Sequence, residues 1–129
     1  MKLVADASVI IAMLTESEEF GSWSTNTLLG SRLYAPDCLV VETLNVLRRL
    51  ALQKKITEGH ADYAVTELLR LSIRLVATAN LAERIWSLRP SITAYDAAYV
   101  AVAEIVTAPL ATLDMKLATQ KTGCEFLTP

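Results

Sequence analysis

Residues that build the commonest zinc, redox and histidine-based sites are scarce in this sequence. It contains one histidine, His60, and two cysteines, Cys38 and Cys124, which lie far apart with no CxxC spacing. The cysteine spacing excludes a zinc site built from cysteines and a CxxC redox motif, and a lone histidine in the polar run TEGHAD argues against a histidine-based catalytic triad. We expect both cysteines to be buried free thiols and His60 to lie on the surface.

Long apolar runs are also missing. A membrane-spanning helix needs about 18 to 20 apolar residues in succession, and Glu42, Asp96 and Glu104 interrupt the most apolar segments. Asp6 falls where a signal peptide would have its continuous apolar region. No linker, repeat or low-complexity tract divides the 129 residues. We therefore expect one cytoplasmic domain covering residues 1–129, with no membrane segment.

Short apolar segments alternate along the chain with segments of helical periodicity. Strands are expected at residues 2–6, 33–35, 74–76, 109–114 and 125–127. Helices are expected at residues 7–14, in a segment ending near Gly30, and at 38–55, 58–71, 79–88, 94–107 and 115–121. Pro36 with Asp37, Thr57 and Thr93 provide helix-start signals. The alternation predicts an α/β fold with a parallel sheet covered by helices on both faces.

Four acidic residues each stand alone in apolar surroundings: Asp6 in LVADASV, Glu42 in LVVETLNVL, Asp96 in ITAYDAAYV and Asp114 in PLATLDMKL. Removing an isolated carboxylate from water costs several kcal/mol, or the group stays protonated, unless a cation or several hydrogen-bond donors compensate it. Such compensation is therefore expected at each of these four positions.

The expected elements allow the four carboxylates to converge. Asp6 and Asp114 follow strands, at the edge where open parallel sheets place ligands. Asp96 lies in the first turn of its helix, and Glu42 lies about one and a half turns into another. Each close pair of like charges would cost about 4 kcal/mol at an effective dielectric near 20. Mg²⁺ or Mn²⁺, which prefer oxygen ligands, would make such a cluster favourable.

Most of these acids also have an ordinary structural interpretation. Asp96 fits a helix-capping box that begins at Thr93, Asp114 fits the N-cap of the last helix, and Asp6 fits a strand-to-helix turn. The net charge of −2 is unusual for a protein that binds phosphates. Subtracting the four candidate ligands from 14 acidic residues leaves 10, against 12 basic residues. The charge of the remaining surface thus permits RNA binding but is not evidence for it.

The sequence resembles the PIN-domain ribonucleases, and in particular the VapC toxins. The resemblance covers essentially the whole chain, and its most specific part is the YDAAYVAVAE stretch followed by TLDMKLA. The matching segments are VADASVIIAML with Asp6 and Ser8, VVETLNVLRR with Glu42 and Asn45, AYDAAYVAVAE with Asp96, and LATLDMKLA with Thr112 and Asp114.

The resemblance implies a three-layer α/β/α fold with four or five parallel strands. It also implies an endoribonuclease that needs Mg²⁺, for which Mn²⁺ would substitute, and a toxin that is usually a homodimer inhibited by a small antitoxin protein. By analogy, Asp6, Glu42, Asp96 and Asp114 would hold the metal, with Ser8, Asn45 and Thr112 as supporting polar residues. Hydrolysis by a metal-activated water should leave a 5′-phosphate.

Two other functions remain open at this point. A phosphotransfer domain of the receiver or haloacid-dehalogenase type would also use an aspartate at a strand end, but Ser8 stands where the latter needs a second aspartate. A PIN-like protein could instead bind an antitoxin or RNA without cutting it. For Arg48, Arg49, Lys54 and Lys55 we favour solvation of a helix end over phosphate binding. Trp23 and Trp86 could stack on bases, but among apolar neighbours at helical spacing we expect them in the core or an interface, with no catalytic role.

Overall fold

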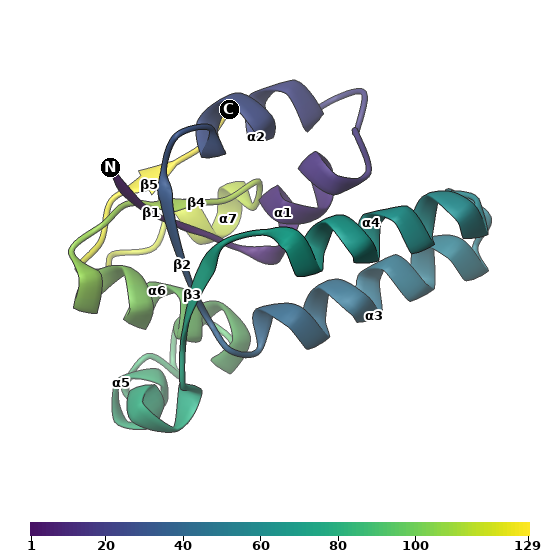
Figure 1. Cartoon of the computed structure of the whole chain (residues 1–129). Helices are drawn as coiled ribbons and strands as arrows, with labels where there is room; N and C mark the ends of the chain where they lie inside the picture. The colour runs from purple at the N-terminus through teal and green to yellow at the C-terminus, as the bar shows by residue number, and fades with distance from the viewer.

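The computed structural model describes residues 1–129 and contains one five-stranded parallel sheet (Figure 1). The strands are β1 (Lys2–Ala5), β2 (Arg32–Pro36), β3 (Ile73–Val76), β4 (Leu110–Ala111) and β5 (Phe126–Leu127). Their order across the sheet is β3-β2-β1-β4-β5, so β1 is central. The α/β class and the expected parallel sheet of four or five strands are confirmed, and the sheet has five.

Helices cover both faces of the sheet and complete a three-layer α/β/α arrangement (Figure 1). They are α1 (Ala7–Leu14), α2 (Gly21–Leu28), α3 (Leu39–Leu52), α4 (Glu58–Arg70), the 3₁₀-helix η1 (Thr78–Leu81), α5 (Ala82–Ser87), α6 (Ala94–Val106) and α7 (Met115–Ala118). Helix α6 packs on β1 and β2 together with α5 and η1, whereas α1 packs with α2, α3 and α4 on the other side. None of these helices has the length and apolarity required to cross a bilayer.

The central position of β1 and α6 explains their composition. Leu3, Val4 and Ala5 are at most 2% exposed because β1 has a strand on each side and a helix on each face. Residues 97–103 of α6 are all buried, and four of these seven residues are alanine. Small side chains let this helix lie close to the sheet, which fixes the height of its first turn above the strand ends.

Several element boundaries differ from the sequence prediction. The strand expected at residues 109–114 is only two residues long, and the last helix ends at Ala118 instead of residue 121. The helix expected at 79–88 is divided into η1 and α5. Trp86 is not in the core, since it is 67% exposed, while Trp23 packs against the core as expected. Cys38 and Cys124 are free but only half-buried.

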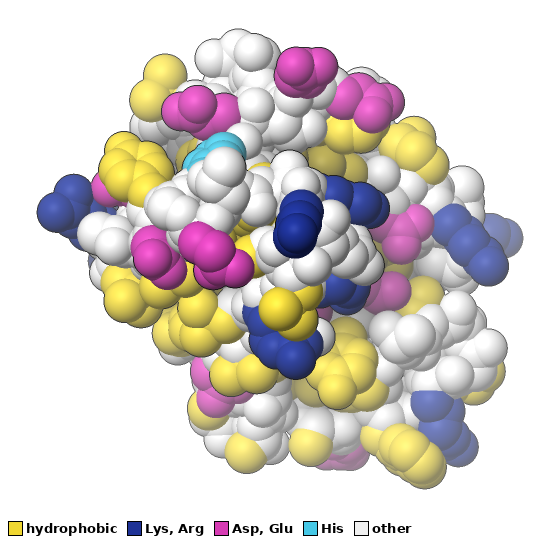
Figure 2. Space-filling view, turned by 90° about the vertical axis from the view of Figure 1, so that its right-hand side faces the viewer, with side chains coloured by type: hydrophobic (Ala, Val, Ile, Leu, Met, Phe, Trp, Pro, Cys, Tyr) yellow, Lys and Arg dark blue, Asp and Glu magenta, His cyan; other side chains and the backbone are white.

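The start and the end of α3 also differ from the sequence prediction. Asp37 does not cap this helix, because its carboxylate accepts a hydrogen bond from the Thr78 amide at 3.2 Å. Lys54 has a φ of 57°, which ends the helical conformation, so Lys54 and Lys55 follow the helix instead of forming its last turn. Figure 2 views the end of the α3–α4 hairpin, where basic side chains gather among acidic and apolar ones.

Candidate functional site

The site begins where two neighbouring strands end. Ala5 of β1 and Ala111 of β4 are direct partners in the parallel register, and the Asp6 amide donates to the Ala111 carbonyl at 3.1 Å. The residues that follow, Asp6 and Thr112, therefore emerge side by side at the carboxyl edge of the sheet. This edge is the usual ligand position in open α/β sheets.

Asp6 is held by three hydrogen-bond donors. Ser8 Oγ donates to its Oδ1 and Thr112 Oγ1 to its Oδ2, each at 2.5 Å, and the Val9 amide donates to Oδ1 at 3.3 Å. Both hydroxyls are also acceptors, because Ser8 Oγ receives the Leu113 amide and Thr112 Oγ1 receives the Asp114 amide. Each hydroxyl therefore donates its proton to Asp6. The Asp6 carboxylate is thus oriented in part by residues 112–114, the segment that carries Asp114.

Burial and hydrogen bonding act on Asp6 in opposite directions. The residue is 6% exposed, and burial raises the pKa of its carboxyl above the ordinary value. The bonds from Ser8, Thr112 and the Val9 amide lower that pKa but do not cancel the effect of burial. A nearby positive charge would complete the compensation that the ionised carboxylate needs.

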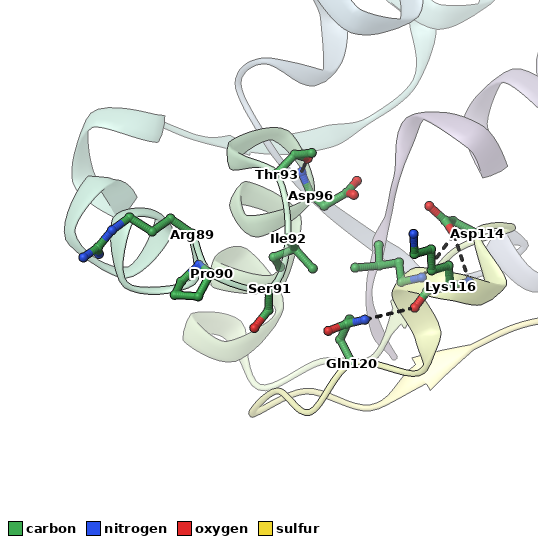
Figure 3. Close-up of a pocket in the computed structure, with 10 residues that line it drawn as sticks. Arg89, Pro90, Ser91, Ile92, Thr93, Asp96, Asp114, Lys116 and Gln120 are labelled. Carbon is green, nitrogen blue, oxygen red and sulfur yellow. Dashed lines mark hydrogen bonds between the residues drawn. The ribbon is translucent and has the colours of Figure 1, made fainter.

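Asp96 and Asp114 line a cleft of about 420 Å³ between the first turn of α6 and helix α7 (Figure 3). Asp114 is the N-cap of α7, and its Oδ1 accepts the amides of Lys116 and Leu117 at 3.0 and 3.1 Å. The capping interpretation of Asp114 is therefore correct, but capping occupies only one of its two oxygens. Its other oxygen, Oδ2, accepts no hydrogen bond from the protein.

Asp96 is electrostatically linked to both strand-end aspartates. Burial raises the pKa of its carboxyl, and the negative charges of Asp114 and Asp6 raise it further, while a hydrogen bond with the Thr93 hydroxyl opposes these effects. Thr93 caps α6 by accepting the Asp96 amide at 3.2 Å. The charges of Asp6 and Asp114 thus both reach Asp96.

Glu42 lies in the first turn of α3, and two donors share its Oε1. Cys38 Sγ donates at 3.2 Å and Tyr99 Oη donates at 3.1 Å. Burial raises the pKa of Cys38 to about 12, with a contribution from Glu42, so the thiol remains protonated as a donor. Burial and the charge of Glu42 likewise raise the pKa of Tyr99 above its ordinary value. The charge of Asp6 also acts on Tyr99, so the charges of both Glu42 and Asp6 reach this hydroxyl.

Of the supporting residues expected from the sequence, the structure joins Ser8 and Thr112 to Asp6 but leaves Asn45 exposed, without a side-chain hydrogen bond. Sequence analysis missed Cys38 and Tyr99. A signal for both exists, because Cys38 lies one helical turn before Glu42 and Tyr99 lies one turn after Asp96. That signal indicates a shared helix face only, whereas the contact between Tyr99 and Glu42 depends on how α3 and α6 pack.

The donor set suits a hard divalent cation. All four candidate ligands are carboxylates, and no group of three His, Cys, Asp or Glu side chains is arranged to hold one ion directly. Zinc and copper sites, which use histidine and cysteine, are therefore unsuitable here. Mg²⁺ keeps several waters and commonly uses only one or two protein carboxylates together with substrate phosphates. The residues present fit a hydrated Mg²⁺ or Mn²⁺ bound in this way.

Comparison with known proteins gives concordant results. The family model described as "PIN domain" matches residues 3–121. Ribonuclease VapC9 of Mycobacterium tuberculosis is 32% identical over 115 residues, which cover 89% of this chain and 87% of that protein.

Two solved structures share the fold. One is Mycobacterium tuberculosis VapC20, titled a sarcin-ricin loop cleaving toxin, with a TM-score of 0.69 and 16% identity over 96% of this chain and 99% of that one. The other is VapBC2 from Rickettsia felis bound to a promoter DNA fragment, with a TM-score of 0.66 and 10% identity over 99% of this chain and 98% of that one.

Proposed function

This chain belongs to the PIN domain family, among the VapC ribonucleases, and on that basis we propose that it cleaves RNA as the toxin of a toxin–antitoxin pair. The observation that carries this proposal is the meeting of Asp6, Asp96 and Asp114 at the carboxyl edge of the sheet, beside an open cleft. Glu42 lies on α3 and accepts a hydrogen bond from Tyr99 of α6, the helix that carries Asp96, which supports a site of four carboxylates.

We propose that Asp6, Glu42, Asp96 and Asp114 hold Mg²⁺ or Mn²⁺, in part through water. Such an ion supplies charge for a phosphate oxygen and lowers the pKa of a bound water. The chain's own residues orient the carboxylates: Ser8 and Thr112 fix Asp6, whereas Cys38 and Tyr99 fix Glu42 through one oxygen and leave Oε2 available. Asp114 likewise retains Oδ2 after capping α7.

The substrate that fits this cleft is a phosphodiester strand, because the opening is wide and polar and the carboxylates line one end of it. A receiver or phosphatase would need a second acid or a lysine arranged around Asp6. The nearest polar partners of Asp6 are instead the hydroxyls of Ser8 and Thr112. This difference favours hydrolysis of a diester over transfer of a phosphoryl group to Asp6.

Partner proteins form a second part of the proposal. Large apolar side chains are exposed on α3 and α4, including Val41 at 70%, Leu52 at 62% and Leu69 at 69%. Exposed apolar groups of this size are typical of surfaces that another protein covers. We propose that a small antitoxin binds the chain and that the toxin itself is a homodimer. Sedimentation of the purified chain, alone and with the candidate antitoxin, would test both statements.

The experiment for the nuclease function is cleavage of end-labelled structured RNA, including a sarcin-ricin hairpin, by the purified chain. We expect cutting with Mg²⁺, none with EDTA, and products that carry a 5′-phosphate. Asp6→Asn and Asp96→Asn should each lower the rate by at least about 100-fold, the scale on which a single preorganised catalytic group acts.

Asp62→Asn is the matched control, since Asp62 is an exposed carboxylate on α4 outside the site, and this variant should cut like the wild type. A 2′,3′-cyclic phosphate product would refute the hydrolytic mechanism. Equal cutting by all variants would assign the activity to a contaminant and favour the non-catalytic interaction protein.

A further inference from the structure

An exposed aromatic side chain lies on α5, the helix that precedes one wall of the carboxylate cleft. Trp86 is 67% exposed, and the guanidinium of Arg89 lies over its ring at 4.6 Å from the centroid. Arg89 Nη1 also donates to the Trp86 carbonyl at 2.9 Å. The indole and the guanidinium are therefore held together as a fixed pair, although neither is part of the apolar core.

Arg89 is one of the residues that line the cleft, but its guanidinium points away from Asp96 and Asp114 and lies over Trp86 (Figure 3). Residues 89–93 form one wall of the cleft and α7, with Lys116, forms the opposite wall (Figure 3). The ion pairs of the protein join Arg70 to Glu67 and Arg84 to Glu104, so neither Arg89 nor Lys116 is paired with an acid. Neither charge is neutralised by a carboxylate, although Arg89 is engaged with the ring and the carbonyl of Trp86.

We propose that Trp86 and Arg89 are positioning residues that hold an unpaired nucleotide next to the cleaved phosphodiester of the RNA, an inference that rests on the proposed ribonuclease function. The base stacks on the face of Trp86 that Arg89 leaves uncovered. Lys116 contacts a phosphate inside the cleft, and Arg89 contacts the phosphate of the stacked nucleotide at the outer side of the cleft wall. Base stacking on aromatic side chains beside a basic groove is the general means of binding single strands, and it tolerates any base.

Charge and composition favour RNA over a protein partner at this position. Only two of the ten residues that line the cleft are hydrophobic, which is unlike the apolar centre of a protein interface. Two cations lie near Asp96 and Asp114: Lys116 on the α7 wall of the cleft, and Arg89 at the outer side of the opposite wall. Without such cations the carboxylates would repel the substrate that they are proposed to cut.

The test measures binding and cleavage separately, with a fluorescein-labelled single-stranded 12-nucleotide oligouridylate for binding and a cleavable structured RNA for kinetics. In EDTA, Trp86→Ala should weaken oligouridylate binding about tenfold, whereas Trp86→Phe, which keeps an aromatic face, should stay within about threefold of the wild type. Tyr63→Ala is the control, because Tyr63 is a 59% exposed aromatic residue on α4, and this variant should bind normally.

With Mg²⁺ and structured RNA, Trp86→Ala should raise KM about tenfold and leave kcat within about twofold, because stacking holds the substrate without touching the reacting atoms. Unchanged binding and KM in Trp86→Ala would overturn the proposal. It would also be overturned if sedimentation showed that Trp86→Ala turns a dimer into a monomer while oligouridylate binding stays intact, since Trp86 would then contact a second copy. A wild-type protein that binds through Trp86 but cuts no RNA would refute the nuclease function and leave the stacking site standing.

Discussion

At the scale of single residues, the hydroxyls around Asp6 determine how the site is built. Thr112 is fully buried, donates to Asp6 Oδ2 at 2.5 Å and accepts the Asp114 amide at 3.0 Å. One side chain therefore sets both the orientation of a carboxylate and the backbone of the next one. Thr43 is equally buried, but its hydroxyl has no hydrogen-bond partner.

This contrast gives a matched pair of substitutions. Thr112→Val should lower the free energy of unfolding by about 1–3 kcal/mol, because it leaves a buried carboxylate oxygen and an amide without their partner. Thr43→Val should be neutral or stabilising, since it removes a buried hydroxyl that forms no hydrogen bond. Urea unfolding of both variants measures the difference, and Thr112→Ser, which keeps the hydroxyl, should lie closer to the wild type. Equal losses in the two valine variants would contradict this account of Asp6.

At the scale of elements, the two ends of α6 are built differently. Its first residue follows Thr93, whose hydroxyl accepts the Asp96 amide, so the cap holds the first turn at the cleft. Its last turn is closed by Thr107 in the left-handed conformation, with φ 54° and ψ 57°, and by the Ala108 amide bonding to the Ala103 carbonyl at 3.0 Å. This is the geometry in which glycine is favoured, and a β-branched residue is strained there.

Thr107→Gly should therefore stabilise the protein by about 0.5–1 kcal/mol, after allowing for the greater freedom that glycine gives the unfolded chain. Thr119→Gly is the control, because Thr119 ends α7 with a φ of −86° and gains nothing from glycine. Thermal unfolding of both variants is the measurement. A lower melting temperature for Thr107→Gly would show that the left-handed turn carries no strain.

The sequence predicts elements well where the signal is local. Thr57 and Thr93 were expected to start helices, and each accepts an amide of its own first turn. The length of β4 was overestimated, because pairing with β1 and β5 and the turn at Asp114 decide where that strand stops. Asp37 was misassigned for a similar reason, since its partner is Thr78, a residue from a distant element.

In the candidate site, too, local signals were visible in the sequence and contacts between distant elements were not. An isolated acid in an apolar segment is visible in the sequence, and the four candidate carboxylates were selected in this way. Their hydrogen-bond partners were only partly accessible, because Tyr99 meets Glu42 through the packing of two helices. The pairing of Trp86 with Arg89 was missed, since apolar neighbours such as Ile85 and Leu88 indicated a buried position.

At the scale of the whole molecule, one ion pair joins three parts of the chain. Arg84 of α5 donates two hydrogen bonds to Glu104 of α6, at 2.7 and 2.9 Å, and the Gly123 amide donates to the same carboxylate at 2.8 Å. A Cβ at position 123 would meet the carboxylate of Glu104, so a larger residue there would make this side chain shift. The contact ties the segment leading to β5 to the helices on one face of the sheet.

Hydrogen bonding by Arg84 lowers the pKa of Glu104 below its ordinary value of 4.5. The folded state therefore binds this proton more weakly than the unfolded state, and the stabilisation is present above about pH 4.5 and lost as the pH falls through the lowered pKa. Glu104→Gln should reduce stability at pH 7 by up to about 1 kcal/mol, as expected for a partly exposed pair, and the difference should shrink in acid. Glu83→Gln is the control in the melting curves, because Glu83 is an exposed acid on α5 that forms no ion pair. If the stability difference between Glu104→Gln and the wild type did not change with pH, the link between Glu104 protonation and stability would be refuted.

The melting temperatures of the wild type and of Asp96→Asn, each measured in EDTA and in Mg²⁺, test most directly whether the carboxylates form one site for a divalent cation. In EDTA, Asp96→Asn should melt higher than the wild type, because burial and the charges of Asp114 and Asp6 disfavour the ionised carboxylate. Mg²⁺ should raise the melting temperature of the wild type and much less that of the variant, because a ligand of the folded state stabilises it. An Asp96→Asn variant that melts lower in EDTA, or that responds to Mg²⁺ like the wild type, would contradict a shared metal site.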